Sequence, residues 1–181
     1  MARELWDAYD REGRPLGFDL VRGEPMPEGV WHMVVEIYAA TPDGRLLVTR
    51  RHPDKSWGLY WEVTGGSVVK GETPAQGAVR ELWEETGIRV EERMLLPVYV
   101  QARPGIDGYA SLYHSFLVFF DPAEQEIRLQ SGETVDWQLL DWASYKRFIL
   151  TDAFTPGIRN RFLEHQAAFD RLMGDRHINM K

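Results

Sequence analysis

Three glutamates in one short stretch are the residues of this 181-residue chain whose types and spacing most directly suggest chemistry. Glu81, Glu84 and Glu85 stand at i, i+3 and i+4, so on a helix their side chains project from one face. Carboxylates that close repel one another, and each raises the pKa of the others unless a cation lies among them. Hard oxygen ligands of this kind suit Mg²⁺ or Mn²⁺. The alternative is a solvated acidic helix face, which is what most glutamate clusters are.

The residues around the glutamates predict a loop that leads into a helix. The helix start is marked by an N-cap, a proline at the first helical position and a capping-box partner, which are Thr73, Pro74 and Gln76. Gly87 lies where a left-handed C-cap would end the helix. Apolar residues at helical spacing should face the core, namely Ala75, Ala78, Val79 and Leu82. Before the helix, in what we expect to be a loop, Gly65 and Gly66 allow tight turns and close approach of the main chain to a ligand.

The segment Gly66–Ile88 also fits every fixed position of the pattern G-x5-E-x7-R-E-U-x-E-E-x-G-U, in which U is apolar. The matching residues are Gly66, Glu72, Arg80, Glu81, Leu82, Glu84, Glu85, Gly87 and Ile88. This pattern is the Nudix box, and so many specified positions rarely match by chance, so the chain resembles the Nudix hydrolase family. The resemblance implies an α/β fold, an α/β/α sandwich with a mixed β-sheet between helices. It also implies a hydrolase of acid anhydrides in phosphorus-containing substrates that uses Mg²⁺ or Mn²⁺.

Nudix enzymes direct a water molecule at a diphosphate while divalent metal ions neutralise charge on the phosphates. By resemblance, the metal ligands are expected to be Glu81, Glu84, Glu85 and the carbonyl of Gly65. Arg80 is expected to orient the glutamates, although its spacing also makes it an ordinary i,i+4 partner of Glu84. Glu72 is structural in some members and nearer to catalysis in others. The catalytic candidates are therefore Glu84, Arg80 and Glu72, together with Glu133.

A general base for such a reaction often comes from a loop before a late strand. Glu133 in SGETVDWQLLDW fits that position, with Asp136 as its rival, and either could instead be an ordinary exposed loop residue. Candidate substrate-binding residues precede the box: Arg50, Arg51, Lys55 and Trp57. The basic residues could reach phosphates and the tryptophan could stack on a nucleobase, but such residues are also common in solvent-facing and packing roles. A nucleoside diphosphate linked to another moiety, a nucleotide-sugar-like compound and a prenyl diphosphate all stay open as substrates.

Segments outside the box are similar to type I isopentenyl-diphosphate isomerase, another Nudix-fold enzyme. They are DREGRPLGFDLVRGE, the histidine of WHMVVEIY, GRLLVTRR, GETVDWQ and the helix after FTP. The chain has Gly65 where the isomerase needs its catalytic cysteine and Ser67 where it needs a metal-binding histidine. The glutamates of its strand near Ser111–Ser115 are missing too. We therefore expect a hydrolase from the isomerase-like branch, with His32 structural; the alternatives are an isomerase and a non-catalytic nucleotide-binding module.

Strand-like segments and turns flank the box on both sides. Before it we expect two hairpins, Glu4–Asp10 with Pro15–Arg22 and Trp31–Ala40 with Arg45–Arg51, and then a short strand at Leu59–Thr64. After it we expect strands at Arg93–Arg103, Ser111–Asp121, Glu126–Gln130 and Thr134–Asp141, with a mobile tip at Pro104–Tyr109. Helices are expected at Trp142–Leu150 and from Thr155–Pro156 onward, the last with an apolar stripe of Ile158, Phe162, Phe169 and Leu172.

Length and composition suit one domain, which we divide into an N-terminal hairpin extension at 1–28, a core at 30–150 and a C-terminal helix at 151–181. The net charge of −7 argues against nucleic acid as a bulk ligand, but not against a small phosphorylated substrate. The chain has no cysteine, which excludes disulfides and thiolate metal sites. Without a membrane-length apolar run or a signal-peptide core, we expect a cytoplasmic protein with no membrane partner, either a monomer or a homodimer.

Overall fold

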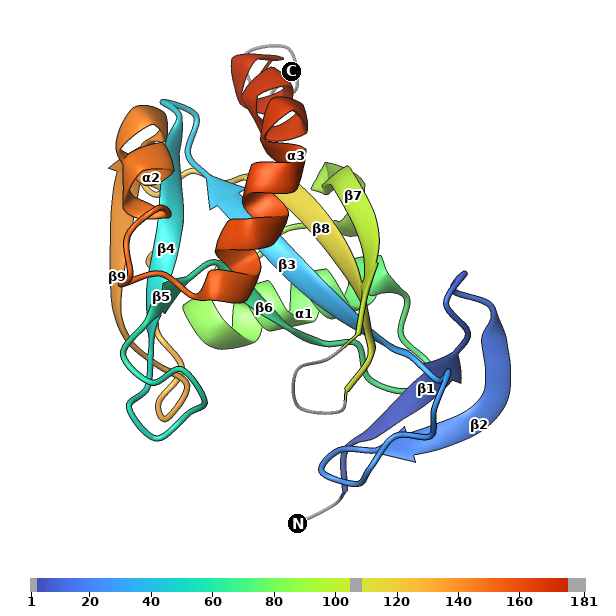
Figure 1. The fold of residues 1–181 in the computed structure, drawn as a ribbon. Helices are drawn as coiled ribbons and strands as arrows, with labels where there is room; N and C mark the ends of the chain where they lie inside the picture. Colours follow the sequence, from blue (N-terminus) through green and yellow to red (C-terminus); the bar gives the residue numbers. More distant parts are fainter. Residues whose placement is uncertain (1–2, 105–108, 176–181) are drawn as a thin grey trace.

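The computed structural model describes residues 3–104 and 109–175, and Figure 1 shows how their elements are arranged. The strands are β1 (Leu5–Tyr9), β2 (Pro15–Val21), β3 (His32–Ala40), β4 (Arg45–Arg51), β5 (Trp61–Glu62), β6 (Thr64–Ser67), β7 (Leu96–Arg103), β8 (Ser111–Phe119) and β9 (Thr134–Asp141). The helices are α1 (Pro74–Thr86), α2 (Trp142–Phe148) and α3 (Pro156–Gly174), and a short 3₁₀ helix at Glu92–Met94 precedes β7.

Strand β3 is the centre of a mixed sheet. It runs parallel to β8 along its whole length, from His32 opposite Ser111 to Ala40 opposite Phe119. On its other edge it pairs antiparallel with β6 and, at its end, with β4. Strand β7 continues the sheet beyond β8, while β4 also pairs with β5 and β9. One parallel pair among antiparallel neighbours confirms the mixed sheet expected from the sequence.

The two faces of β3 are covered by different helices (Figure 1). Val35 and Ile37 belong to the same buried cluster as Leu82 of α1. Tyr38 belongs to the opposite cluster, with Phe162 of α3. Successive side chains of a strand point to opposite faces, so burial of both faces explains the nearly continuous apolar sequence of β3. The fold therefore confirms the predicted α/β/α sandwich.

A buried ion pair joins β3 to α3 on this second face. Arg161 donates through Nε to Oε1 of Glu36 at 3.0 Å and contacts the same oxygen through Nη2. The hydroxyl of Tyr99 also donates to the Glu36 carboxylate, and the Arg161 guanidinium lies 3.7 Å from the ring centroid of Tyr113. Loss of either charged partner would leave the other buried and uncompensated, which is strongly destabilising. The pair therefore helps to hold α3 in place beside its expected apolar stripe, of which Ile158, Phe162 and Phe169 are buried and Leu172 is partly buried.

The local signals at the ends of α1 and in the first hairpin are confirmed. Thr73 accepts a hydrogen bond from the main chain of Gln76, whose side chain accepts one in return, and this completes the capping box. Gly87 ends the helix in the left-handed conformation, with φ of 74°. β1 and β2 pair antiparallel as the expected N-terminal hairpin. Each of these features depends on residues that are close together in the sequence, so local patterns are enough to predict them.

Before the helix, one expectation is wrong and another is confirmed only in part. Gly65 and Gly66 are not in tight turns; they lie in the extended strand β6, opposite Glu36 and Val35 of β3. Glycine is needed there because a Cβ on Gly65 would lie 2.4 Å from the carbonyl oxygen of Val35. The second hairpin is formed, since β3 and β4 pair antiparallel, but the pairing is limited to its tip, where Ala40 is opposite Leu46. Beyond the tip, β3 pairs with β6 and β4 pairs with β9, so the two hairpin strands are no longer neighbours.

The expected strand at Glu126–Gln130 is likewise not formed. The main-chain N–H of Arg128 donates to the carbonyl of Thr86 at 2.8 Å, and that of Gln130 donates to the carbonyl of Glu85 at 3.1 Å. Carbonyls in the last turn of a helix have no partner inside the helix. The segment thus satisfies the end of α1 instead of extending the sheet, and this places the following loop beside the glutamates.

Two further expectations concern mobility and membranes. Of the expected mobile tip Pro104–Tyr109, residues 105–108 lie outside the described part of the chain. Within the described part, no helix has the length and apolar character needed to cross a membrane.

Candidate active site

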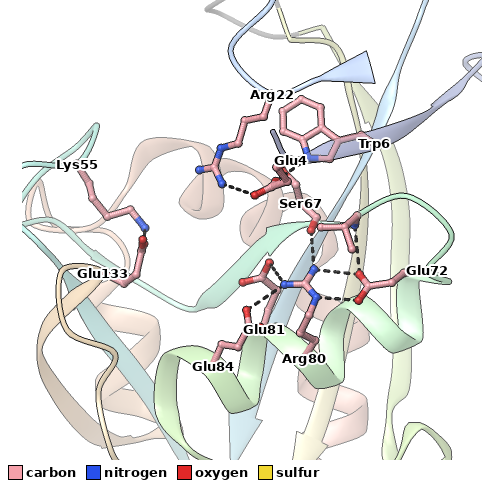
Figure 2. Close-up of polar contacts among 11 residues, drawn as sticks. Glu4, Trp6, Arg22, Lys55, Ser67, Glu72, Arg80, Glu81, Glu84 and Glu133 are labelled. Atoms are coloured by element: carbon pink, nitrogen blue, oxygen red, sulfur yellow. Dashed lines mark hydrogen bonds and ion pairs between the residues drawn. The ribbon is translucent and has the colours of Figure 1, made fainter. Parts of the chain in front are cut away.

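Arg80, on α1, is the centre of a hydrogen-bond network that connects the start of the box to its glutamates (Figure 2). Its Nε and Nη2 donate to the two carboxylate oxygens of Glu72 at 2.8 and 3.0 Å. Its Nη1 donates to Glu81 at 2.8 Å and to Glu84 at 3.1 Å, and Nη2 also reaches the carbonyl of Ser67 at 2.9 Å. Although burial opposes the effect, the carboxylates of Glu72 and Glu81 raise the pKa of Arg80. The guanidinium therefore stays charged and holds three carboxylates around it, which is more than a simple i,i+4 contact.

Glu81 directs its carboxylate toward strand β6. A Cβ added to Gly66 would lie 2.3 Å from Cδ and Oε1 of Glu81, so only glycine leaves room for this carboxylate. Burial raises the pKa of Glu81, and the charge of Arg80 opposes that effect without cancelling it. The negative charges of Glu84 and of Glu4, on the N-terminal hairpin, add to the rise. Glu81 is thus a largely buried carboxylate in a negatively charged environment.

Glu85 is the most deeply buried of the three box glutamates, with 5% of its surface exposed. Its Oε2 has no hydrogen-bond partner among the described residues. Burial raises the pKa of Glu85 well above its ordinary value, and the charges of Glu62 and Glu81 raise it further, while Lys55 and a main-chain hydrogen bond from Gly65 act in the opposite direction. A buried polar atom without a partner is costly, so packing alone does not explain this carboxylate.

The chemistry of this donor set fits a divalent cation. Glu62, Glu81 and Glu85 are buried carboxylates close enough for their charges to interact, and a cation among them would relieve that repulsion. In the ranges 3–104 and 109–175, no three histidine, aspartate or glutamate side chains converge into a complete metal centre. Arg80 holds Glu81 and Glu84 through one oxygen each, which leaves the second oxygen of each carboxylate for a cation.

Two ion pairs lie on the other side of the site, one between β4 and β5 and one between the loops after β4 and before β9. Nη1 of Arg51 donates to both carboxylate oxygens of Glu62, at 2.8 and 2.6 Å. Lys55 pairs with Glu133, as Figure 2 shows, and the main-chain N–H of His52 donates to the carbonyl of Glu133 at 2.8 Å. The charge of Lys55 also reaches Glu85, since it lowers the pKa of that carboxyl group. The structure thus brings Arg51, Lys55 and Glu133 to the glutamate cluster.

The other predicted residues make contacts elsewhere. Arg50 donates to the carbonyl of Leu59 at 3.0 Å. Trp57 is 54% exposed and meets the ring of Tyr60 edge-on, with centroids 5.3 Å apart. Asp136 lies within β9, where it is opposite Arg50, and its carboxylate accepts from the main chain of its own neighbour. Among the residues described, none of these contacts connects Arg50, Trp57 or Asp136 to the box glutamates.

His32 begins β3 beneath the N-terminal hairpin. Its ring stacks on Trp6 with centroids 4.2 Å apart, and its Nε2 lies 2.9 Å from the hydroxyl of Ser111. Burial lowers the pKa of His32 from 6.5 to about 4, and the opposing effect of Glu4 is smaller. The imidazole is therefore neutral near pH 7 and is packed against aromatic and hydroxyl groups, as expected for a structural residue.

Three residues near the site, namely Glu4, Arg22 and Glu62, are not among those predicted from the sequence. Glu62 had one available signal, because it is an acidic residue inside the short apolar segment that leads into the box. Glu4 and Arg22 had no such signal. Glu4 directly precedes β1 and Arg22 directly follows β2 of the N-terminal hairpin, and only the tertiary structure brings that hairpin to the glutamates (Figure 2).

Comparison with known proteins identifies the family. Residues 30–165 match the family described as NUDIX domain, and the chain belongs to this family. An uncharacterised Nudix hydrolase of Listeria monocytogenes is 37% identical over 90 residues, a stretch that spans 49% of this chain and 53% of that protein. The match thus spans about half of the relative's length.

Solved structures show the same fold. The crystal structure of DR0079 from Deinococcus radiodurans aligns with a TM-score of 0.70 at 20% identity, over 90% of this chain and 99% of that one. A bifunctional NMN adenylyltransferase/ADP ribose pyrophosphatase of Francisella tularensis, crystallised with AMP and a manganese ion, aligns with a TM-score of 0.57 at 21% identity. That alignment covers 81% of this chain and 42% of the Francisella protein. At these identities the likeness concerns the fold alone.

Proposed function

We propose that the protein is a hydrolase dependent on Mg²⁺ or Mn²⁺ that cleaves the diphosphate bond of a nucleoside diphosphate linked to another moiety, or of a similar small phosphorylated compound. The observation that carries the proposal is the buried Oε2 of Glu85, which has no partner among the described residues and lies near Glu81 in a complete Nudix box. Carboxylate oxygens of this kind are the ligands that these cations prefer.

The proposed ligands come from two elements. Glu81, Glu84 and Glu85 of α1 would bind the cation together with the carbonyl of Gly65 in β6. The N–H of Gly65 is hydrogen-bonded to Glu85. Since the N–H and C=O of one strand residue point to the same side, the Gly65 carbonyl is directed toward the same region. A bound cation would neutralise phosphate charge and lower the pKa of an attacking water molecule.

Arg80 and Glu72 would act as positioning residues. The Arg80 guanidinium holds Glu72 with two hydrogen bonds, and it holds Glu81 and Glu84 with one each. This arrangement limits the directions in which Glu81 and Glu84 can turn before a cation binds. In this proposal Glu72 secures Arg80, and its part in the reaction is indirect.

Glu133 is our candidate for the general base. Its loop follows the segment that satisfies the end of α1, and its side chain pairs with Lys55. A substrate phosphate near Lys55 would compete with Glu133 for this ammonium group. The carboxylate of Glu133 would then be free to accept a proton from the attacking water.

The substrate class rests on the surrounding cationic and aromatic groups. Arg51 and Lys55 lie on the loop side of the glutamates, and the exposed ring of Trp57 follows on the same loop. A nucleotide needs both phosphate contacts and a stacking surface. The Francisella fold relative was crystallised with AMP and manganese, which is consistent with this class.

We propose that the chain derives from the isomerase-like branch of the family, but not that it acts as an isomerase. The order of similar segments supports that origin, but the chain has no cysteine to serve as the catalytic cysteine of an isopentenyl-diphosphate isomerase. We also propose that residues 30–150 form the catalytic core, with 1–28 and 151–181 as extensions of the same domain.

A substrate screen tests the function. Purified protein should release products from ADP-ribose, nucleotide sugars or nucleoside diphosphates in Mg²⁺ or Mn²⁺ and not in excess EDTA. Glu85→Gln should slow turnover by about 100-fold or more, because losing an anionic ligand removes several kcal/mol of charge stabilisation. Glu91→Gln, at an exposed carboxylate with 65% side-chain exposure, is the matched control. Absence of hydrolysis throughout the screen, or normal turnover by Glu85→Gln, would overturn the proposal.

A further inference from the structure

The N-terminal hairpin lies outside the matched range 30–165, yet it is tied directly to the Nudix box. The main-chain N–H of Lys70 donates to the carbonyl of Leu5 at 2.8 Å, and that of Gly71 donates to the carboxylate of Asp7 at 2.8 Å. Nζ of Lys70 also reaches Asp19 at 2.6 Å. These bonds connect both hairpin strands to the loop that precedes α1, so the position of the hairpin relative to the site is defined.

Glu4 and Arg22 are the hairpin side chains that face the site. Glu4 accepts hydrogen bonds from Nε1 of Trp6 at 2.8 Å and from Nη1 of Arg22 at 2.9 Å. Trp6 is itself buried against His32. Figure 2 shows the Glu4–Arg22 pair above Glu81, across from Lys55 and Glu133. The hairpin thus forms one side of the space over the glutamates.

The cations around this space differ in how many of their donors are already used. Arg80 has all three guanidinium nitrogens bonded to carboxylates or to a carbonyl. Lys55 is paired with Glu133. Arg22 uses Nη1 for Glu4, and its Nε and Nη2 have no partner in the described part of the chain. Its side chain is 64% exposed. Arg22 is therefore the cation of this group with the most free donors.

We propose that Arg22 binds a phosphate of the substrate on the hairpin side of the site and that Glu4 holds it in position. This inference rests on the proposed diphosphate hydrolase function. A guanidinium with two free donors can bind two phosphate oxygens at once, which an ammonium group cannot do with the same geometry. A cation is also needed there, because Glu4, Glu81 and Glu84 would otherwise repel an incoming diphosphate. Arg22 thus determines affinity for the diphosphate group and leaves the bond-breaking step to other residues.

Kinetics and binding of Arg22→Gln test the proposal. In saturating Mg²⁺, the KM of Arg22→Gln should rise about tenfold or more with kcat nearly unchanged, because a contact made equally in the ground and transition states affects binding alone. Binding of methylenediphosphonate, a diphosphate analogue with carbon in place of the bridging oxygen, should weaken by a similar factor in calorimetry. Arg22→Lys, which keeps the charge but loses the two-pronged geometry, should fall between the two proteins.

Arg14→Gln is the matched control, since Arg14 is an exposed arginine at the turn of the same hairpin, with 74% side-chain exposure, and is paired with Asp10. It should keep the KM and analogue affinity of the unmodified protein. If Arg22→Gln also keeps both while the unmodified protein hydrolyses its substrate, Arg22 is not a phosphate-binding residue and the proposed function still stands. If the unmodified protein neither binds the analogue nor hydrolyses any diphosphate in Mg²⁺ or Mn²⁺, both proposals are overturned. A melting temperature of Arg22→Gln equal to that of Arg14→Gln separates a lost contact from a displaced hairpin.

Discussion

The carboxylate of Glu81 lies in the space that any side chain at Gly66 would occupy, since a Cβ there would be 2.3 Å from its Cδ. This close approach of β6 and α1 sets the direction of Glu81. Gly66→Ala should therefore displace the carboxylate, weaken Mn²⁺ binding and lower turnover by about tenfold or more. Gly174→Ala is the control, because a Cβ there meets no atom within 4 Å. Calorimetry with Mn²⁺ and an activity assay decide the matter; unchanged affinity and turnover in Gly66→Ala would contradict this account.

Arg80 should contribute measurably to stability through the geometry of its guanidinium. Arg80→Lys keeps a positive charge but cannot maintain the paired hydrogen bonds to Glu72 together with those to Glu81 and Glu84. We expect the free energy of unfolding to fall by about 2 kcal/mol, as for other broken, partly buried charge networks. Arg93→Lys, at an arginine with 79% side-chain exposure, should change it by less than about 0.5 kcal/mol. Urea denaturation of both variants gives the comparison, and equal losses would show that the network adds nothing specific.

Glu133 and its rival Asp136 can be separated by their kinetics. If Glu133 is the general base, Glu133→Gln should lower kcat by about 10²–10⁴-fold while Mn²⁺ affinity stays constant. Asp136→Asn should have little effect, because Asp136 lies in strand β9 and bonds to its own neighbour. Steady-state rates with saturating metal provide the measurement. A large loss in Asp136→Asn together with normal turnover in Glu133→Gln would reverse the assignment.

Metal should stabilise the folded protein. A cation that binds only the folded state contributes RT ln(1 + [L]/Kd), which is about 2.7 kcal/mol for 10 mM Mg²⁺ and a Kd of about 0.1 mM. For a domain of this size, that corresponds to a rise in melting temperature of roughly 5–10 °C. Replacing Glu81, Glu84 and Glu85 together with glutamine should abolish the rise. Melting curves in Mg²⁺ and in EDTA test this, and identical curves for the unmodified protein would count against the metal site.

The buried neutral His32 should make stability depend on pH. Its folded-state pKa of about 4 is below the ordinary value of 6.5, so the unfolded chain takes up a proton first as the pH falls. Stability from this residue is therefore complete above about pH 7 and is lost progressively toward pH 4, by about 3 kcal/mol in all. The difference in unfolding free energy between the unmodified protein and His32→Gln should become smaller as the pH falls from 7 to 4. His52→Gln, at a partly exposed loop histidine, is the control, and a difference that does not change with pH would refute the assignment.

The sequence by itself determined the parts of this protein that depend on neighbouring residues. The capping box of Thr73 and Gln76, the C-cap at Gly87 and the apolar face of α1 all follow from spacing within about four residues. The same is true of the glutamates and Arg80, which a helix must place on nearby positions. The family, the sandwich fold and the N-terminal hairpin could therefore be predicted from the order of the residues alone.

Only the tertiary structure decided how distant segments meet around those residues. Gly65 and Gly66 look like turn residues in isolation, but pairing with β3 makes them a strand. Glu126–Gln130 has a strand-like sequence, but the open carbonyls at the end of α1 are better partners for its main chain. Glu85 lies near Glu62 of the strand before the box, and Glu81 lies near Glu4 of the hairpin. Lys55 pairs with Glu133 of a late loop. Such contacts depend on packing between distant segments and leave no local pattern in the sequence. Packing and burial determine the pKa values of the site residues and which of their hydrogen-bond donors have no partner.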